Sequence, residues 1–217
     1  MGKKKGTLIY HWDGHDALVD GKWVDRVQGF VFETKHSGYI PQQSNDGAYV
    51  IESNNFFYSS LNSTPGLNIG RLWKIEVDFS VLNFRPGYKS IVLFDFGSIG
   101  NASHGFGLMY ENGGCYSSNY KGLSNSDDAN YGPHLYSDLV EGVRHIVATG
   151  CKAYGSENDI QWLSIDGANP TYADYPHPQT YFNKNFNGSN GAFGAGYRSD
   201  SVGYSLKLYS IKIFNYD

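Results

Sequence analysis

Two segments of the chain, residues 113–142 and 167–191, concentrate tyrosine, histidine, asparagine and aspartate. Sugars present apolar C–H faces and rings of hydroxyl groups. Aromatic rings can stack on the faces, while phenol, amide and carboxylate groups can hydrogen-bond to the hydroxyls. These residue types therefore predict carbohydrate binding. The candidate ligand-binding residues, one of them a tryptophan outside the two segments, are Tyr116, Tyr120, Asn130, Tyr131, His134, Trp162, Tyr172 and Tyr175.

Two other interpretations of these residues stay open. The tyrosines can simply pack the two segments onto the body of the protein, and a mixture of Tyr, Ser, Gly and Asn also makes good protein-recognition surfaces. Neither segment contains a convincing strand pattern. Both are therefore expected to be long loops, which in compact domains are usually functional or mobile.

Imidazoles and carboxylates also gather at residues 11–16, which read His-Trp-Asp-Gly-His-Asp. The spacing matches neither the helical metalloprotease motif nor a zinc finger. The central glycine instead predicts an N-terminal strand followed by an Asp-Gly turn, with Trp12 and Trp23 packed under the sheet. His145, beside Arg144 on another predicted strand, is interpreted as a structural histidine.

The elements that position these residues are predicted to be strands. Residues 74–81 alternate polar and apolar side chains, and successive side chains of a strand point to opposite faces. In the last run, Leu206 and Leu208 are out of phase with Ile211 and Ile213, which indicates a bulge or a strand buried on both faces. The other runs of this kind are at 48–57, 90–96, 105–110, 144–149, 159–165, 192–197 and 204–214.

Composition limits the classes of protein. With 217 residues, 40% hydrophobic and 16% aromatic, the chain can bury a sizeable core and is too aromatic to be disordered. Seventeen basic and 21 acidic residues give a net charge of −4 without a basic stripe, so nucleic acid is excluded as an expected partner. No run approaches the ~18 apolar residues of a membrane span, and no signal peptide is readable after Lys3–Lys5.

Several motifs together resemble a known superfamily. Residues 159–167, ending in Asp166-Gly167, are similar to the strand and Asp-Gly hairpin of concanavalin A-like lectin and glucanase domains of the laminin-G-like type. An Asp-Gly pair favours a tight turn with positive φ. The pieces at 46–50, 73–81, 143–149, 194–196 and 206–215 follow in the order of that superfamily.

The resemblance, with the alternation, predicts an all-β fold: an antiparallel two-sheet jelly-roll sandwich of the concanavalin A-like kind. We expect one domain over residues 1–217, with residues 1–6 as a basic arm. What the resemblance implies for function is binding of glycans or proteins, and in some members glucan hydrolysis.

The hydrolytic members carry two glutamates around an aspartate on one strand. Glu76 and Asp78 match the first half of that motif, but Ser80 and Val81 stand where the second glutamate belongs. A retaining glycosidase needs two carboxylates in distinct roles. We therefore expect no enzymatic activity and interpret Glu76 and Asp78 as a solvated polar row.

The resemblance implies that calcium can be bound, because members of the family often bind this ion. Asp127 and Asp128 are the candidate calcium ligands, and the alternative is that they are a solvated acidic pair. No other cofactor is indicated. The two cysteines, Cys115 and Cys151, do not form a disulfide framework, and whether they form a single disulfide bond is left open.

Two functional hypotheses follow. The first is a non-catalytic module that binds a glycan or host-surface polysaccharide through the Tyr/Asn/Asp-rich segments. The second is a structural or attachment protein on a particle surface, such as a bacteriophage decoration protein, head fibre or tail adhesin, whose contacts are to other virion proteins. Either places the protein outside the cell or on a virion surface; membrane insertion is not expected, and the oligomeric state is left open.

Overall fold

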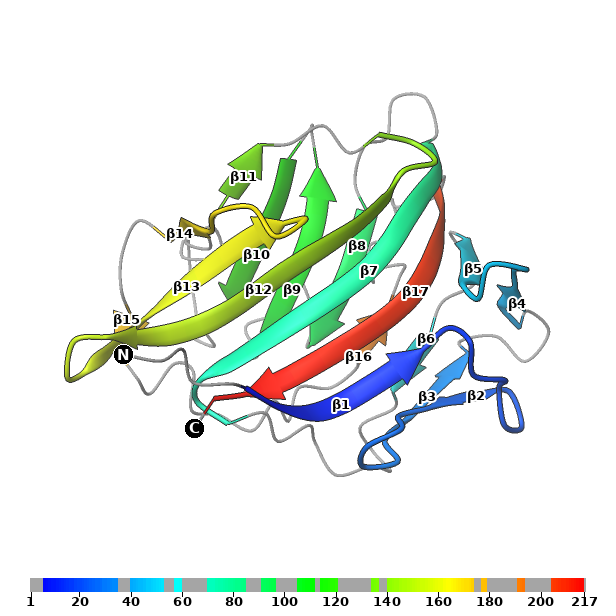
Figure 1. The fold of residues 1–217 in the computed structure, drawn as a ribbon, viewed down its shortest axis with the longest axis horizontal. Coiled ribbons are helices and arrows are strands. Elements are labelled where there is room, and N and C mark those ends of the chain that lie inside the picture. Colours follow the sequence, from blue (N-terminus) through cyan, green and yellow to red (C-terminus); the bar gives the residue numbers. More distant parts are fainter. Residues whose placement is uncertain are drawn as a thin grey trace.

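The computed structural model describes residues 6–34, 40–52, 57–59, 70–84, 91–96, 105–111, 114–120, 134–136, 140–173, 177–178, 191–193 and 204–216. The fold is an antiparallel two-sheet jelly-roll sandwich, as predicted, and the described residues contain strands and no helix. Figure 1 shows one sheet, with β7, β12 and β17, in front of the other, with β8, β9 and β10. No described helix is available to cross a membrane.

Sheet A has the strand order β14-β13-β12-β7-β17-β5-β4, with β1 also on β17 and β15 also on β13. Sheet B has the order β11-β10-β9-β8-β16-β6-β3-β2. The strands of sheet A are β1 (Thr7–Asp13), β4 (Gln42–Gln43), β5 (Tyr49–Glu52), β7 (Trp73–Phe84), β12 (Arg144–Tyr154), β13 (Asn158–Ile165), β14 (Thr171–Tyr172), β15 (His177–Pro178) and β17 (Tyr204–Asn215). Those of sheet B are β2 (Lys22–Val24), β3 (Val31–Thr34), β6 (Phe57–Ser59), β8 (Ile91–Phe96), β9 (Gly105–Glu111), β10 (Gly114–Tyr120), β11 (His134–Tyr136) and β16 (Gly191–Phe193).

Alternation along β7 separates the two faces of sheet A. Ile75, Val77 and Phe79 are fully buried against sheet B, because every second side chain of a strand points to the same side. The intervening residues Lys74 and Glu76 lie on the opposite side, which we call the outer face of sheet A.

A bulge at Tyr209 sets the phase of β17. The register against β7 shifts between Leu208 and Ser210, so of the two interpretations of this phase change, a bulge or burial on both faces, the structure has the bulge. The shift keeps Leu206 and Leu208 buried before the bulge and Ile211 and Ile213 buried after it. The bulge also divides the side of β17 that faces away from β7. On that side, β5 pairs with β17 before the bulge and β1 pairs with it after the bulge.

Aromatic side chains fill the end of the core near the N-terminus. Trp12 of β1 contacts Phe32 of β3 with ring centroids 4.5 Å apart, and Trp23 contacts Phe57 at 4.8 Å. Both tryptophans are fully buried, as predicted. The contact of Trp12 with Phe32 joins sheet A to sheet B.

The predicted Asp-Gly turn is confirmed. Asp166 and Gly167 have φ of +51° and +74°, and the Ala168 N–H donates to the Ile165 carbonyl at 2.9 Å. The Asp20-Gly21 pair forms a similar turn that was not predicted.

The expectation of two strandless loops is wrong. β10 and β11 lie within residues 113–142, and β14 and β15 lie within 167–191. The sequence of β10, Gly-Cys-Tyr-Ser-Ser-Asn-Tyr, has no apolar alternation, so only its backbone pairing with β9 and β11 identifies it as a strand. The expected strand at 48–57 is also divided, into β5 and β6 of different sheets.

Asp159, whose side chain is fully buried, receives two hydrogen bonds from Arg71, at 2.7 and 2.6 Å. Removing one partner of a buried pair leaves an uncompensated charge. We expect Arg71→Leu to lower the free energy of unfolding by about 3 kcal/mol or more, measured by urea denaturation. Arg71→Leu/Asp159→Leu should regain part of that loss.

The matched control is Lys22→Leu, which breaks a pair with Glu33 in which both side chains are nearly half exposed. Its effect should stay below about 1 kcal/mol. Equal effects of Arg71→Leu and Lys22→Leu would contradict the structural role given to Asp159.

Candidate functional site

Four of the predicted ligand-binding residues lie on strands at one edge of the sandwich. Trp162 of β13 is the register partner of Tyr172 of β14, and Tyr116 of β10 is the register partner of His134 of β11. Cα atoms of β11 approach those of β13 and β14 within 8 Å. The edges of the two sheets that carry these residues therefore meet.

The other predicted residues are not brought to this edge by any described contact. Tyr120 lies at the far end of β10, opposite Gly105. Tyr131, Tyr175 and Asn130, with the candidate calcium ligands Asp127 and Asp128, fall outside the described residues. The calcium site stays a prediction.

Trp162 lies across the neighbouring strand β12. A Cβ atom added to Gly150 would be 2.8 Å from Cζ2 and 2.9 Å from Cε2 of the Trp162 ring. The indole therefore occupies the space that a side chain at position 150 would take. Trp162 is half-buried and Tyr172 is 40% exposed, so part of this aromatic surface faces solvent. We call Trp162, Gly150 and Tyr172 the Trp162 platform.

A lysine ammonium borders the platform. Lys152 follows Gly150 by two residues on β12 and so lies on the same face. Its Nζ is 4.0 Å from the centroid of the Tyr172 ring, within the range of a cation–π contact.

Two further cation–π contacts extend along the outer face. Lys74 is opposite Gly150, and its Nζ lies 4.1 Å from the centroid of the Phe214 ring. Arg144 lies 3.9 Å above the Tyr209 ring. This face of sheet A thus combines aromatic surface with cationic groups over several adjacent strands.

The Arg144 end of the outer face is an ion-paired cluster. Arg144 donates two hydrogen bonds of 2.7 Å to Asp78, and Asp46 accepts from Lys207 and Tyr209 at 2.8 Å each. The hydrogen bond from Lys207 is the main cause that holds the pKa of Asp46 well below its usual range. Burial, followed by the contact with Asp46, raises the pKa of Tyr209 to about 12. Tyr209 therefore stays protonated at neutral pH.

The expectation that Glu76 and Asp78 form a solvated row is half wrong. Glu76 is partly exposed and accepts from Lys74 at 2.8 Å, but Asp78 is buried beneath Arg144. The Arg144 guanidinium that pairs with Asp78 also lies over the ring of Tyr209, the residue at the bulge.

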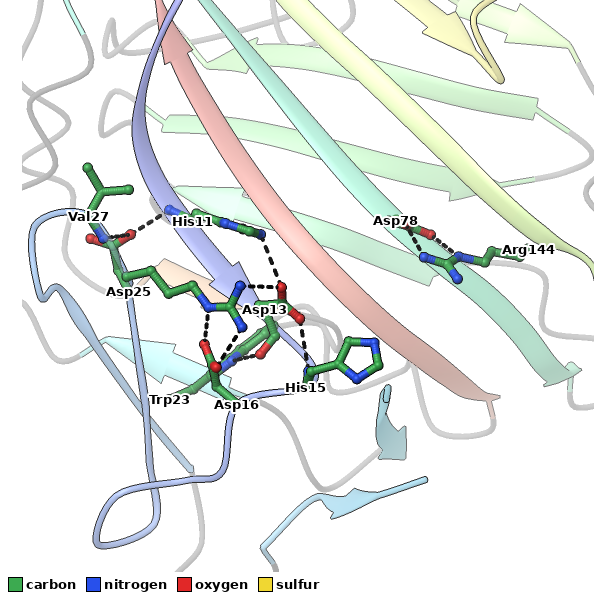
Figure 2. A network of polar contacts seen from close by, with 10 residues as sticks. His11, Asp13, His15, Asp16, Trp23, Asp25, Val27, Asp78 and Arg144 are labelled. Atoms are coloured by element: carbon green, nitrogen blue, oxygen red, sulfur yellow. Dashed lines mark hydrogen bonds and ion pairs between the residues drawn. The ribbon is translucent and has the colours of Figure 1, made fainter. Parts of the chain in front are cut away.

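The N-terminal cluster of histidines and aspartates holds a guanidinium (Figure 2). Arg26 donates to both oxygens of Asp16, at 2.6 and 2.7 Å, and approaches Asp13 at 2.7 Å. A cation would need the position between these carboxylates that Arg26 occupies. No three metal-ligating side chains gather among the described residues. The arrangement is that of a structural network.

Asp25 completes that network. It is buried and accepts from the backbone N–H groups of His11 and Val27 (Figure 2). It also accepts from the backbone N–H of Gln28. These hydrogen bonds hold the segment after β2 against β1.

Sequence reasoning missed Gly150, Lys152, Arg144 and Tyr209 as members of this face. Gly150 carried a usable signal, because a glycine inside a strand often marks a close approach of another group. The side-chain contacts of the other three depend on strand register, which the local pattern does not reveal.

The comparisons with known proteins show the fold. No family model matches the sequence, and no curated protein matches it. Domain 4 of AbnA, a GH43 extracellular arabinanase from Geobacillus stearothermophilus solved with arabinotriose, is 10% identical with a TM-score of 0.65, over 97% of this chain and 93% of that one. The Emp47p carbohydrate recognition domain is 12% identical with a TM-score of 0.57, over 99% of both chains.

The botulinum neurotoxin serotype D binding domain is 12% identical with a TM-score of 0.59, and the match covers 96% of this chain. The chain spans 47% of the length of that domain. These three structures share the β-sandwich fold described above, in agreement with the fold class predicted from the sequence.

The position of His11 makes stability depend on pH. Burial, helped by Lys212 and opposed by Asp13, lowers the pKa of His11 below its ordinary value of 6.5. The unfolded chain therefore binds a proton more readily than the folded protein, so acidification through and below pH ~6.5 destabilises the fold. We expect His11→Gln to lose less stability than the wild type between about pH 7.5 and pH 5, measured by urea denaturation. An identical pH dependence in both proteins would contradict this.

Proposed function

We propose that the protein is a non-catalytic carbohydrate-recognition module whose ligand stacks on the Trp162 platform. The observation that carries the proposal is the indole of Trp162, which packs against Gly150 and is only partly buried. A partly exposed indole beside a tyrosine offers an apolar surface for the C–H face of a sugar ring and hydrogen-bonding groups at its rim. The pairing of Tyr116 with His134 brings two further predicted residues to the same edge.

The fold supports the same function by analogy. The structures that share it include a carbohydrate recognition domain and a domain solved with arabinotriose. Within this fold, the laminin-G-like subtype stays a prediction, and no comparison supports the particle-surface hypothesis.

The contacts of the acidic pair on β7 support a role without catalysis. Glu76 is paired with Lys74, and Asp78 is held by both donors of Arg144. A retaining mechanism needs one carboxylate free to attack and another kept protonated for the leaving group. Two carboxylates neutralised by neighbouring cations suit neither task.

Glycan-array screening followed by titration with the best glycan tests the binding site. Trp12, Trp23 and Trp73 are fully buried, whereas Trp162 is half-buried, so the ligand-induced change in tryptophan emission should come from Trp162. We expect Trp162→Ala to weaken binding by about tenfold or more, the scale of a lost aromatic stacking contact. Tyr172→Ala should weaken it in the same direction.

The control is Leu82→Ala, an exposed apolar residue of sheet A about 27 Å from Lys74 along β7. It should bind as the wild type does. Full affinity of a folded Trp162→Ala variant, or no binding to any glycan at millimolar concentration, would refute the proposed site.

We expect the pure protein to release no reducing ends from polysaccharides that it binds. Glu76→Gln should change the free energy of unfolding by no more than about 0.5 kcal/mol, as for most surface substitutions. Release of reducing ends that is abolished by Glu76→Gln would show an enzyme instead.

A further inference from the structure

The cations on the outer face differ in how their charge is balanced. Lys74 is 2.8 Å from a Glu76 oxygen, and Arg144 is 2.7 Å from an Asp78 oxygen. Lys152 is exposed, and no carboxylate among the described residues lies within 4.0 Å of its ammonium group. Its ammonium group lies over the face of the Tyr172 ring, a neutral group. Among the described residues, therefore, no carboxylate balances the positive charge that Lys152 presents at the surface.

That charge lies beside the Trp162 platform. Gly150, on which the indole rests, precedes Lys152 by two residues, a distance of about 6.6 Å along a strand. Tyr172, over which the ammonium lies, is the register partner of Trp162. A sugar ring stacked on the indole would thus have Lys152 at its rim, where ring substituents project.

The chemistry of an ammonium group determines which substituent it favours. It offers three N–H donors and accepts no hydrogen bond. A hydrogen bond between charged partners is roughly twice as strong as one between neutral partners. A carboxylate on the ring therefore gains more from Lys152 than a hydroxymethyl group does.

We propose that the ligand is an acidic glycan, in which a uronate ring stacks on Trp162 and its carboxylate pairs with Lys152. The inference rests on the proposed function and adds the class of sugar. The net charge of the chain is −4, so its overall field does not attract polyanions. Any preference for an acidic sugar must come from local groups, which makes Lys152 the residue to test.

The experiment compares matched pairs of glycans. Alginate, polygalacturonate and hyaluronan oligosaccharides are titrated beside their carboxyl-reduced, neutral forms. We expect at least one acidic form to bind about tenfold more tightly than its neutral form, as for one charge-assisted hydrogen bond. This preference should shrink as NaCl is raised from about 50 to about 500 mM.

Variants assign the preference to one side chain. Lys152→Gln should reduce the acidic-over-neutral ratio to about threefold or less, and Lys152→Arg should restore most of it because the charge is kept. Lys22→Gln removes the same charge from an exposed site in sheet B and should leave the ratio unchanged. Because Lys152 is exposed, its variants are expected to fold, which thermal denaturation checks.

Each other result overturns the inference in a recognisable way. Equal or better binding of the neutral forms in every pair, with loss of binding in Trp162→Ala, would refute the acidic ligand and keep the proposed function. An unchanged ratio in Lys152→Gln would refute the role of this lysine. A preference confined to sulfated glycans over their desulfated forms would replace the carboxylate by a sulfate. Failure of all glycans to bind would refute the proposed function itself.

Discussion

The ladder between β7 and β17 is the constraint on which sheet A depends. It runs along the whole of both strands, yet the apolar residues of β17 change phase in the middle. Without an extra residue, a strand that pairs throughout would send half of its apolar side chains to solvent. The bulge at Tyr209 supplies that extra residue, so the apolar side chains before and after it are all buried. Gly14 passes so close to it that an added Cβ would lie 2.8 Å from the Tyr209 carbonyl oxygen.

The same ladder arranges the outer face. β7 pairs Lys74 opposite Gly150 of β12. Because Gly150 has no side chain, the Trp162 indole can pack against β12 at this position. At the other end, the bulge brings Tyr209 under Arg144. One end of the face is therefore a closed, ion-paired cluster that stabilises the sheet. The other end, which we propose as the binding surface, combines a half-buried indole, an exposed tyrosine and a lysine that no carboxylate among the described residues balances.

Much of the fold could be predicted from alternation, because strands such as β7 and β17 bury one face and expose the other. The turn at Asp166-Gly167 was also readable, since its φ values suit these residues. β10, β11 and β14 were not, because these strands carry no apolar alternation and are defined by their pairing with neighbouring strands. Within the site, Trp162 and Tyr172 were predicted by residue type. Their proximity, and the roles of Gly150 and Lys152, follow from strand register, which depends on contacts remote in sequence.

The most direct test of a glycan-binding outer face is a ¹H–¹⁵N NMR titration of the protein with the glycan that it binds. The chain has four tryptophans and hence four indole N–H signals, which single Trp→Phe variants assign. We predict that the Trp162 indole signal shifts most, together with the backbone amides of Gly150, Lys152 and Tyr172. Shifts concentrated on sheet B, with the Trp162 signal unmoved at saturation, would contradict it.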